Sequence, residues 1–269
     1  MNNSSSIFSG LFGGVYMPFR ACVKHASLLN MLVKREIIVR TSGTLLGKLW
    51  PLLQPALQVA GFWFLFGIVY GMRQDRGPGF LEFFLVGMLP WLCLSEVLNR
   101  SVGMFREFSA LYRRTPFPIE ILPILIMIIP GFVYTIIYGL LCLFIFGPAA
   151  AVNSLIVMPL LLLWLLPFVL LFSILGLFIR DFAQALPFFL TLIMYSTPIL
   201  FLPEMLPAWY QEWLWLNPLA DVMTAVHALV QGMPFNPLTA VRLLALWFVL
   251  LVPSWLLFRR SMPHIREVL

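Results

Sequence analysis

Long runs of apolar residues, each near the length needed to cross a lipid bilayer, recur along this chain. A transmembrane helix needs about 20 mostly apolar residues. Six spans are predicted on that basis, at about Trp50–Gly71, Phe80–Val102, Ile119–Phe146, Leu155–Ile179, Phe182–Leu202 and Leu238–Phe258. Of the 269 residues, 61% are hydrophobic and only 10% are charged, whereas a soluble domain has roughly 25% charged residues. The sequence therefore predicts an all-α polytopic membrane protein with six transmembrane helices.

The remaining composition favours one membrane domain without a soluble appendage. Residues 1–19 are rich in Ser, Gly and Asn and lack the layout of a cleaved signal, so we expect a flexible cytoplasmic tail. Residues 20–269 then form a single transmembrane domain. The three cysteines have neither metal-ligand nor pairing spacing, and no metal site is expected.

Basic residues are distributed unevenly between the two sides of the predicted membrane. Fourteen of the 17 Lys and Arg residues lie on the termini, on segment 99–120 or at Arg180, whereas Arg73, Arg76 and Arg242 lie on the other side. The positive-inside rule therefore predicts that both termini and segment 99–120 are cytoplasmic. The formal net charge of +6 is an indicator of sidedness, since no nucleic-acid-binding motif accompanies it.

Residues 20–48 mix basic and apolar residues at helical spacing. Lys24, Asn30 and Lys34 share one side of a helical wheel, and Leu29 and Val33 share the other. This pattern favours an N-terminal helix lying in the cytoplasmic interface of the membrane, with its basic residues toward the headgroups. A cytoplasmic helix packed on protein is the alternative.

The segment 99–118 is basic although long apolar runs flank it. Arginine is costly in hydrocarbon, so the segment is predicted to lie at or beyond the membrane surface. Between Ser101 and Tyr112 only Gly103 disfavours a helix, and Pro116 and Pro118 then end it. A short basic helix between two spans suits a surface that receives force from a soluble partner; an ordinary basic loop is the alternative.

Prolines divide residues 203–237 into pieces too short to span a membrane. Two short helices are predicted, at about Ala208–Trp215 and Leu219–Gln231, which re-enter from the outer face and border the exit of a pathway. The alternative is a helical hairpin that lies flat on the outer leaflet with its Trp residues at the interface.

Short motifs in a fixed order carry a family resemblance. They are Leu45-Leu46-Gly47-Lys48-Leu49-Trp50 with Pro55, Gly87-Met88-Leu89-Pro90-Trp91, Asn99 with Ser101, Phe117-Pro118-Ile119-Glu120-Ile121-Leu122-Pro123, Arg180-Asp181, Ser196-Thr197-Pro198-Ile199 and Asn217-Pro218-Leu219. With them the chain resembles the membrane subunit of an ABC exporter of the second permease class, closest to subunits that export O-antigen, capsule or teichoic acid polysaccharides. The chain departs from the family pattern at two places, which bear on the details of the substrate. His227 stands where family members often have Arg, and Tyr112-Arg113-Arg114 stands where a Lys-Val pair is common.

The resemblance implies a homodimer of this chain with two copies of a separate ATPase, in a bacterial inner membrane. ATP and Mg would be bound by that partner, and no cofactor by this chain, which has no phosphate-binding Gly-rich loop. Segment 99–118 would be the coupling helix and 203–237 the periplasmic gate. The predicted coupling residues are Arg106, Glu107, Phe108, Tyr112, Arg113 and Arg114. The predicted gate residues are Trp209, Trp213, Asn217, Pro218, Asp221 and His227.

The implied substrate is a glycan on a polyprenyl pyrophosphate carrier. Aromatic faces hold sugars without fixing their register, so Trp63 and Tyr70 on the first span and Phe188 and Tyr195 on the fifth are predicted to line the path. Arg35, Arg40 and Lys48 are candidates for the pyrophosphate, or for anchoring to lipid headgroups. Glu96 and Arg100, one helical turn apart, are predicted to pair with each other.

The sequence is compatible with other function classes. A drug or lipid exporter of the same permease class is the nearest alternative, and the aromatic content favours a polysaccharide. A membrane-embedded enzyme needs clustered acids, or His with acids, and the three His residues are scattered. An ion channel is disfavoured because no span shows a charged ring or a filter-like loop.

Overall fold

The computed structural model describes residues 18–71, 79–110, 117–201, 206–234 and 236–268, and every regular element among them is helical. In chain order these are α2 (Ala26–Thr41), η1 (Gly47–Leu49), α3 (Trp50–Trp63), the π-helix η2 (Phe64–Val69), α5 (Phe80–Glu107), η3 (Ile119–Ile121), α7 (Leu122–Phe146), α8 (Pro148–Phe178), α9 (Phe182–Ser196), α10 (Ala208–Trp213), η5 (Leu214–Leu216), α11 (Pro218–Gln231) and α12 (Pro237–Val268). The predicted all-α class is confirmed for this part of the chain.

Within the described ranges, five helical runs are long and apolar enough to cross a membrane. They have between 23 and 31 residues: Gly47–Val69, Phe80–Glu107, Ile119–Phe146, Pro148–Phe178 and Pro237–Ile265. The chain is therefore a multi-pass membrane protein. These runs agree with five of the six predicted spans.

The remaining predicted span, Phe182–Leu202, is wrong at its end. Helix α9 stops at Ser196 after 15 residues, a length of about 22 Å against about 30 Å of hydrocarbon. Thr197 is extended, with a ψ of 140°, because a residue that precedes a proline avoids the helical region. Pro198 thus ends the helix earlier than hydropathy predicts.

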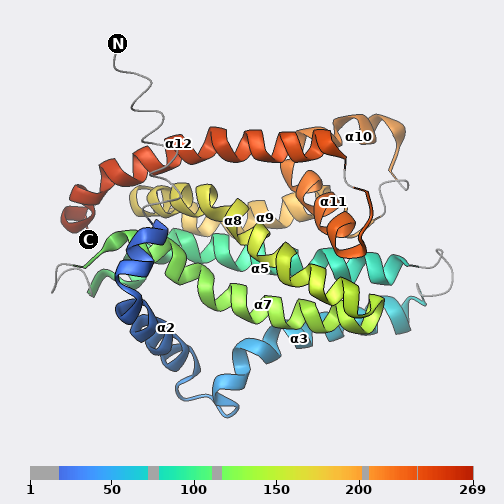
Figure 1. Ribbon diagram of the computed structural model, residues 1–269, viewed down its shortest axis with the longest axis horizontal. Helices are drawn as coiled ribbons and strands as arrows, with labels where there is room; N and C mark the ends of the chain where they lie inside the picture. Colours follow the sequence, from blue (N-terminus) through green and yellow to red (C-terminus); the bar gives the residue numbers. More distant parts are fainter. Residues whose placement is uncertain (1–17, 72–78, 111–116, 202–205, 235, 269) are drawn as a thin grey trace.

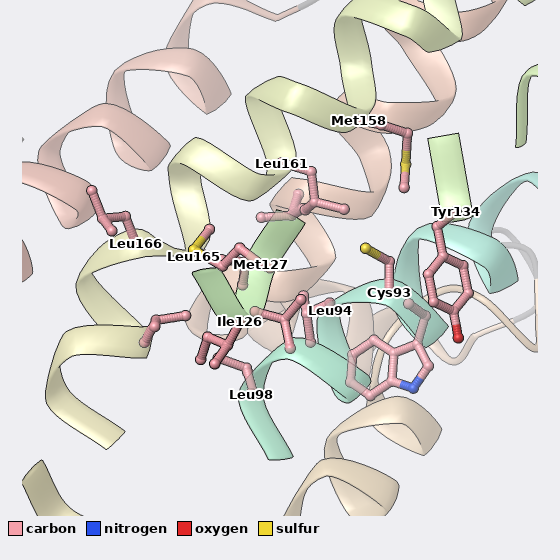
Figure 2. Close-up of a cluster of buried hydrophobic side chains, with 14 of the residues drawn as sticks. Cys93, Leu94, Leu98, Ile126, Met127, Tyr134, Met158, Leu161, Leu165 and Leu166 are labelled. Atoms are coloured by element: carbon pink, nitrogen blue, oxygen red, sulfur yellow. The ribbon is translucent and has the colours of Figure 1, made fainter. Parts of the chain in front are cut away.

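Helix α5 lies at the centre of the bundle and packs on α7 and α8. Figure 2 shows the cluster of buried side chains where these three helices meet, including Cys93, Leu94, Ile126, Leu161 and Leu165. Apolar side chains do not drive helix association in lipid as they do in water, so close packing has to hold this bundle together. The α5–α8 crossing is such a contact, because a Cβ atom on Gly176 would lie 2.2 Å from the carbonyl oxygen of Val102.

The two ends of the bundle carry different elements. Helices α10 and α11 lie at one end, and α2 and the last turns of α12 lie near the other (Figure 1). The C-terminal part of α5 is at the α2 end, where Arg100 reaches Glu36, and its first turns are at the α11 end, where Phe83 contacts His227. One helix therefore connects the two ends.

The predicted separate helix in segment 99–118 is wrong for its first half. Residues up to Glu107 continue α5 without interruption, and the first break is at Phe108. Val102 marks the end of the apolar run, but no residue there ends the helix, and Gly103 is tolerated in a helix interior. The rest of the predicted helix includes residues 111–116, which lie outside the described residues.

Two other helix ends differ from the predictions. Helix α8 begins at Pro148 rather than near Leu155, because Gly147 turns the chain at a φ of 89° and proline suits a first helical turn. Helix α12 continues ten residues past Phe258 to Val268, through Arg259 and Arg260. Polar residues end a membrane span without ending a helix.

The two short helices predicted in 203–237 are present. Residues 208–216 form α10 and η5, and residues 218–231 form α11. The prolines at 207, 218 and 237 each stand at a helix start, where the missing amide hydrogen is not needed.

Candidate functional site

A chain of ion pairs joins α2 to α5 at the inner end of the bundle, which we define as the end that carries α2. Glu36, in the middle of α2, accepts hydrogen bonds from Arg40 Nε at 3.1 Å and from Arg100 Nη2 of α5. Arg40 Nη1 also donates to Glu96 at 3.2 Å, and Arg100 Nη2 to Glu107 at 3.3 Å. We call Glu36, Arg40, Glu96, Arg100 and Glu107 the ion-pair chain.

The predicted pairing of Glu96 with Arg100 is wrong. Glu96 bonds to Arg40 of α2, and Arg100 bonds to Glu36 of α2 and to Glu107. Glu36 is only 7% exposed, so its carboxylate needs buried cationic partners, and both guanidinium groups turn toward it. Arg100 Nη1 also donates to the carbonyl oxygen of Ile126 on α7, at 3.2 Å.

The face that α2 turns toward the bundle includes the predicted apolar side, because Leu29 and Val33 pack against the core. The buried residues of α2 are Leu32, Glu36 and Thr41, whereas Asn30, Lys34 and the preceding Lys24 are exposed. The alternative of a helix packed on protein is thus supported for this face. The exposed basic side remains available to the membrane surface.

A polar cavity of about 500 Å³ lies beside the ion-pair chain, between α3, α5 and α7. Gln54 and Gln58 of α3 line one wall, and Ser95 and Glu96 of α5 with Tyr134 of α7 line another. Its complete lining is Arg40, Trp50, Pro51, Gln54, Pro55, Gln58, Leu92, Ser95, Glu96, Arg100, Ile129, Pro130, Val133 and Tyr134. This volume lies in the range of about 300–1,000 Å³ that is usual for small-ligand sites.

The three predicted pyrophosphate or headgroup residues are not brought together. Arg40 lines the polar cavity but is paired with two carboxylates. Arg35 and Lys48 are exposed and do not line that cavity. Arg35 and Lys48 therefore remain candidates for contact with headgroups.

The predicted coupling residues have different surroundings. Arg106 is exposed, and its Nη2 donates to the carbonyl oxygen of Gly176 on α8 at 2.8 Å. Glu107 is exposed beside Arg100, but Phe108 is only 3% exposed and packs in the core. Phe108 therefore lies beneath this surface and is not part of it, because its ring is packed among the buried residues of the bundle. Tyr112, Arg113 and Arg114 lie outside the described residues.

At the outer end, which carries α10 and α11, Asn217 joins α11 to the end of α9. Its Oδ1 accepts the backbone N–H of Leu219 at 3.1 Å and so caps α11. Its Nδ2 donates to Thr197 Oγ1 at 2.9 Å and to the carbonyl oxygen of Ser196 at 3.3 Å. The hydroxyl of Tyr210, on α10, also donates to Ser196 O at 3.3 Å. The motifs at 196–199 and 217–219 are therefore in contact.

The motif at 87–91 contacts both of these elements. A Cβ atom on Gly87 would lie 3.1 Å from Nε2 of His227 and 3.6 Å from Cγ2 of Ile199. The His227 ring stacks on Phe83 with ring centroids 4.1 Å apart and planes 6° from parallel. We call Phe83, Gly87, Ile199, Asn217 and His227 the outer junction.

His227 is buried in this junction without a hydrogen bond from either ring nitrogen to the described residues. Burial lowers the pKa of its imidazole to about 4, because the charged form loses hydration. The ring is therefore neutral at physiological pH. Histidine acts here as a flat stacking group.

The other predicted gate residues lie around the junction. Asp221 accepts a hydrogen bond from Arg242 Nη2 of α12 at 2.9 Å, and burial still raises the pKa of its carboxyl although the arginine opposes the shift. Pro218 begins α11, and Trp209 and Trp213 are more than half exposed. The tryptophans thus present apolar rings on the surface of α10, as either prediction for this segment requires.

The four predicted path residues are all exposed in the single chain. Trp63, Tyr70, Phe188 and Tyr195 are 42%, 61%, 63% and 58% exposed, respectively. None of them lines the polar cavity or the apolar cavities of about 580 Å³ and 330 Å³. Helices α3 and α9, which carry Trp63, Phe188 and Tyr195, both pack on α5. A path lined by these four would need a wall from outside the chain.

The sequence did not point to an apolar cavity of about 580 Å³ between α8, α9 and the α10–α11 segment. Aromatic and aliphatic residues line it, with Asn217 and Ser196 at one side. Phe189, which lines it, is the neighbour of the predicted path residue Phe188. Within the described residues, no group of three His, Cys, Asp or Glu side chains is arranged to hold a metal ion.

The family profile of the ABC-2 type transporters matches residues 27–230, three quarters of the chain, which include the ion-pair chain and the outer junction. This chain belongs to the ABC-2 type transporter family. The matched range contains the residues that join α2, α5, α9 and α11, so both sites lie within the part of the chain that matches the family.

Curated relatives extend over most of the chain. An O-antigen export system permease protein, RfbA, of Klebsiella pneumoniae is 25% identical over 248 residues, which cover 90% of this chain and 95% of the relative. RfbA of Myxococcus xanthus is 28% identical, with 85% and 92% covered. A polysialic acid transport protein, KpsM, of Escherichia coli is 27% identical, with 72% and 78% covered.

Sequence reasoning missed Glu36, Gln54 and Gln58 as site residues. The signal that points to them is a polar side chain inside a mostly apolar helix, where lipid exposure is costly. The basic residues around Glu36 make it read as one charge of a basic segment. The nearby prolines draw attention to the backbone of α3 and away from its two glutamines.

Proposed function

We propose that this chain is the membrane-spanning subunit of an ATP-driven exporter that carries a polysaccharide across a bacterial inner membrane. One observation carries the proposal: the relatives that match over most of their length are named for O-antigen export or polysialic acid transport. Both cargoes are polysaccharides. The ABC-2 family membership supplies the mode of action, transport coupled to an ABC ATPase.

ATP hydrolysis would take place on a separate polypeptide, and this chain would not itself be an enzyme. The exposed positions of Trp63, Tyr70, Phe188 and Tyr195 support a homodimer, because a second copy would supply the opposite wall of a path lined by these rings. Two ATPase subunits with ATP and Mg would complete the complex.

The basic inner end is the proposed cytoplasmic end, with both termini on that side. Lys24, Arg35, Arg106 and Arg259 are exposed at this end, as the positive-inside rule requires. Arg106 and Glu107 would form part of the docking surface for the ATPase, supported from beneath by Phe108. The periplasmic gate would then be α10 and α11, re-entering from the outer face.

Helix α5 is the proposed link between ATPase and gate. Its last turn holds Arg106, which is bonded to α8, and its first turns hold Phe83 and Gly87 against His227 of α11. A rigid helix passes a displacement at one end to the other, so movement at the docking surface would alter the outer junction.

The proposed cargo is linked to a polyprenyl pyrophosphate lipid. Arg35 of α2 and Lys48 of η1 are exposed and are the proposed contacts for the pyrophosphate or for lipid headgroups. Arg40 fits this role less well, since Glu36 and Glu96 occupy its guanidinium group.

Export of a lipid or drug is the second candidate. The observation that favours it is the aromatic-lined apolar cavity of about 580 Å³ beside α9 and α11, which suits an acyl chain better than a sugar.

Deletion of the gene, with complementation by the intact chain, tests the proposal. Loss of surface polysaccharide with accumulation of the lipid-linked glycan inside the cell is expected. Purification from native membranes in mild detergent, followed by mass spectrometry, should recover an ATPase subunit and polyprenyl-linked glycan. Normal surface polysaccharide in the deletion strain, or co-purification of small lipids or drugs only, would overturn the polysaccharide assignment.

A further inference from the structure

Two glutamines and a tryptophan form one stripe on α3. Trp50, Gln54 and Gln58 are spaced four residues apart and so share one face of the helix, and all three line the polar cavity. The glutamine side chains make no hydrogen bond to the described part of the chain. Unpaired amides on a span that is otherwise apolar are costly against lipid, so this face is suited to water or to a polar ligand.

The opposite wall supplies further hydrogen-bonding groups. Glu96 and Arg100 of α5 and Tyr134 of α7 face the cavity, and Arg100 is held in place by bonds to Ile126 O and to two carboxylates. Donors, acceptors and aromatic rings thus surround a space of about 500 Å³. These are the groups that bind hydroxyl-rich, ring-shaped molecules.

The charge of the ion-pair chain argues against an anionic ligand here. Its two guanidinium groups bond to three carboxylates, so the formal charge of the five residues is negative when all are ionised. A pyrophosphate in the cavity would have to displace a carboxylate from Arg40 or Arg100 and would then lie beside it. A neutral polar molecule avoids that repulsion.

We propose that this cavity binds a neutral saccharide unit of the exported chain and does not bind the pyrophosphate of its carrier. The Trp50 ring offers an apolar face to the sugar ring, and Gln54, Gln58 and Glu96 bond to its hydroxyl groups. The inference rests on the proposed export of polysaccharide and assigns the sugar-binding site at the inner end.

The binding test uses a thiol placed in the cavity wall. In a Leu92→Cys variant of the full chain in detergent, reaction with a water-soluble maleimide is timed, with the parent chain as background because Cys22, Cys93 and Cys142 are buried. One probe is the oligosaccharide released by mild acid from the host's own surface polysaccharide, and the other is inorganic pyrophosphate. We expect several-fold slower labelling with the oligosaccharide and an unchanged rate with pyrophosphate.

Protection by pyrophosphate, or no protection by the oligosaccharide, overturns the proposal. So does a thiol that fails to react without any ligand, since protein or detergent then fills the cavity. Adding Gln54→Leu and Gln58→Leu should raise the oligosaccharide concentration for half-protection about tenfold. The exposed Gln184 lies outside the cavity, and Gln184→Leu should leave that concentration unchanged.

The same glutamine variants, returned to the deletion strain, separate this inference from the proposed function. Loss of surface polysaccharide with Gln54→Leu/Gln58→Leu, but not with Gln184→Leu, supports both. If the deletion strain lacks surface polysaccharide while Gln54→Leu/Gln58→Leu restores it fully, export stands and the saccharide site is overturned. If the deletion strain keeps its polysaccharide, the proposed function fails first.

Discussion

The position that a Cβ atom would take on Gly176 lies 2.2 Å from the carbonyl oxygen of Val102, so α5 and α8 touch backbone to backbone. Close approach of this kind is how helices associate in lipid, where burial of apolar side chains has little driving force. On the same turn of α8, the Gly176 carbonyl accepts the hydrogen bond from Arg106. Packing of the bundle and placement of the proposed docking surface thus depend on one glycine.

Substitution of Gly176 by Ala should destabilise the chain markedly. The obstacle is backbone, which cannot rotate away, so the helices have to separate, at a cost of about 1–3 kcal/mol or more. Thermal unfolding in detergent should show a lower midpoint. The matched control is Gly103→Ala on α5, where a Cβ atom would meet nothing within 4 Å and the change should be neutral or slightly stabilising. Equal midpoints for the two variants would contradict the close crossing.

Removal of Arg100 should leave the buried Glu36 without its partner from α5. Arg40 still bonds to Glu36 in this variant, so the cost should stay below the roughly 3–5 kcal/mol of a buried charge left without any partner, and Arg100→Leu should fold less well or loosen α2 from the bundle. The double variant Arg100→Leu/Glu36→Leu should recover most of that loss, since neither charge is then stranded. Folded yield and thermal midpoint measure both effects, and equal damage from single and double variants would argue against the pairing.

Asn217 has two separable functions, and two substitutions distinguish them. Asn217→Asp keeps the oxygen that caps α11 but loses the donor to Thr197 and Ser196, so we expect normal folding and reduced export. Asn217→Ala should lose both, with about 0.5–2 kcal/mol less stability.

Asn236 provides the control for this pair. Its Oδ1 accepts the backbone N–H of Leu238 at 2.9 Å at the start of α12, so Asn236→Ala removes a comparable cap without the link to α9. Surface polysaccharide is the export readout. Full export by Asn217→Asp would show that the link between α9 and α11 has no role in transport.

Acid should weaken the outer junction through His227. Burial lowers its pKa from 6.5 to about 4, so below pH 6.5 the unfolded chain binds a proton that the folded chain does not. The free energy of unfolding therefore keeps its full value above pH 6.5. It falls as the pH drops toward 4, and the loss is about 2 kcal/mol at pH 5.

Thermal midpoints at pH 7.5 and pH 5 measure this effect. A His227→Phe variant retains a flat ring against Phe83 and should lose most of the pH dependence between those values. His25 is partly exposed at the other end of the bundle, and the His25→Phe variant should keep the pH dependence of the parent chain. An unchanged pH dependence in His227→Phe would assign the effect to other groups.

The sequence determined the features that depend on local composition. Apolar runs of bilayer length define five spans, and the prolines at 207 and 218 mark the starts of the two short outer helices within one residue. Both follow because hydrocarbon thickness and the missing amide hydrogen of proline act on the chain wherever it lies. The ordered motifs likewise indicated the family before any contact between them was known.

Tertiary structure alone decided which side chains meet. Glu96 and Arg100 have the right spacing to pair on α5, yet each has a partner on or beside α2, because a helix surface offers several neighbours and burial of Glu36 selects among them. In the same way, only the approach of α11 to α5 turns His227 into a stacking group against Phe83, and only the packing of α3, α5 and α7 places Gln54 and Gln58 beside Glu96. Local sequence sets where helices begin and end. The free-energy cost of leaving charges and amides unpaired then decides which side chains of different helices bond to one another.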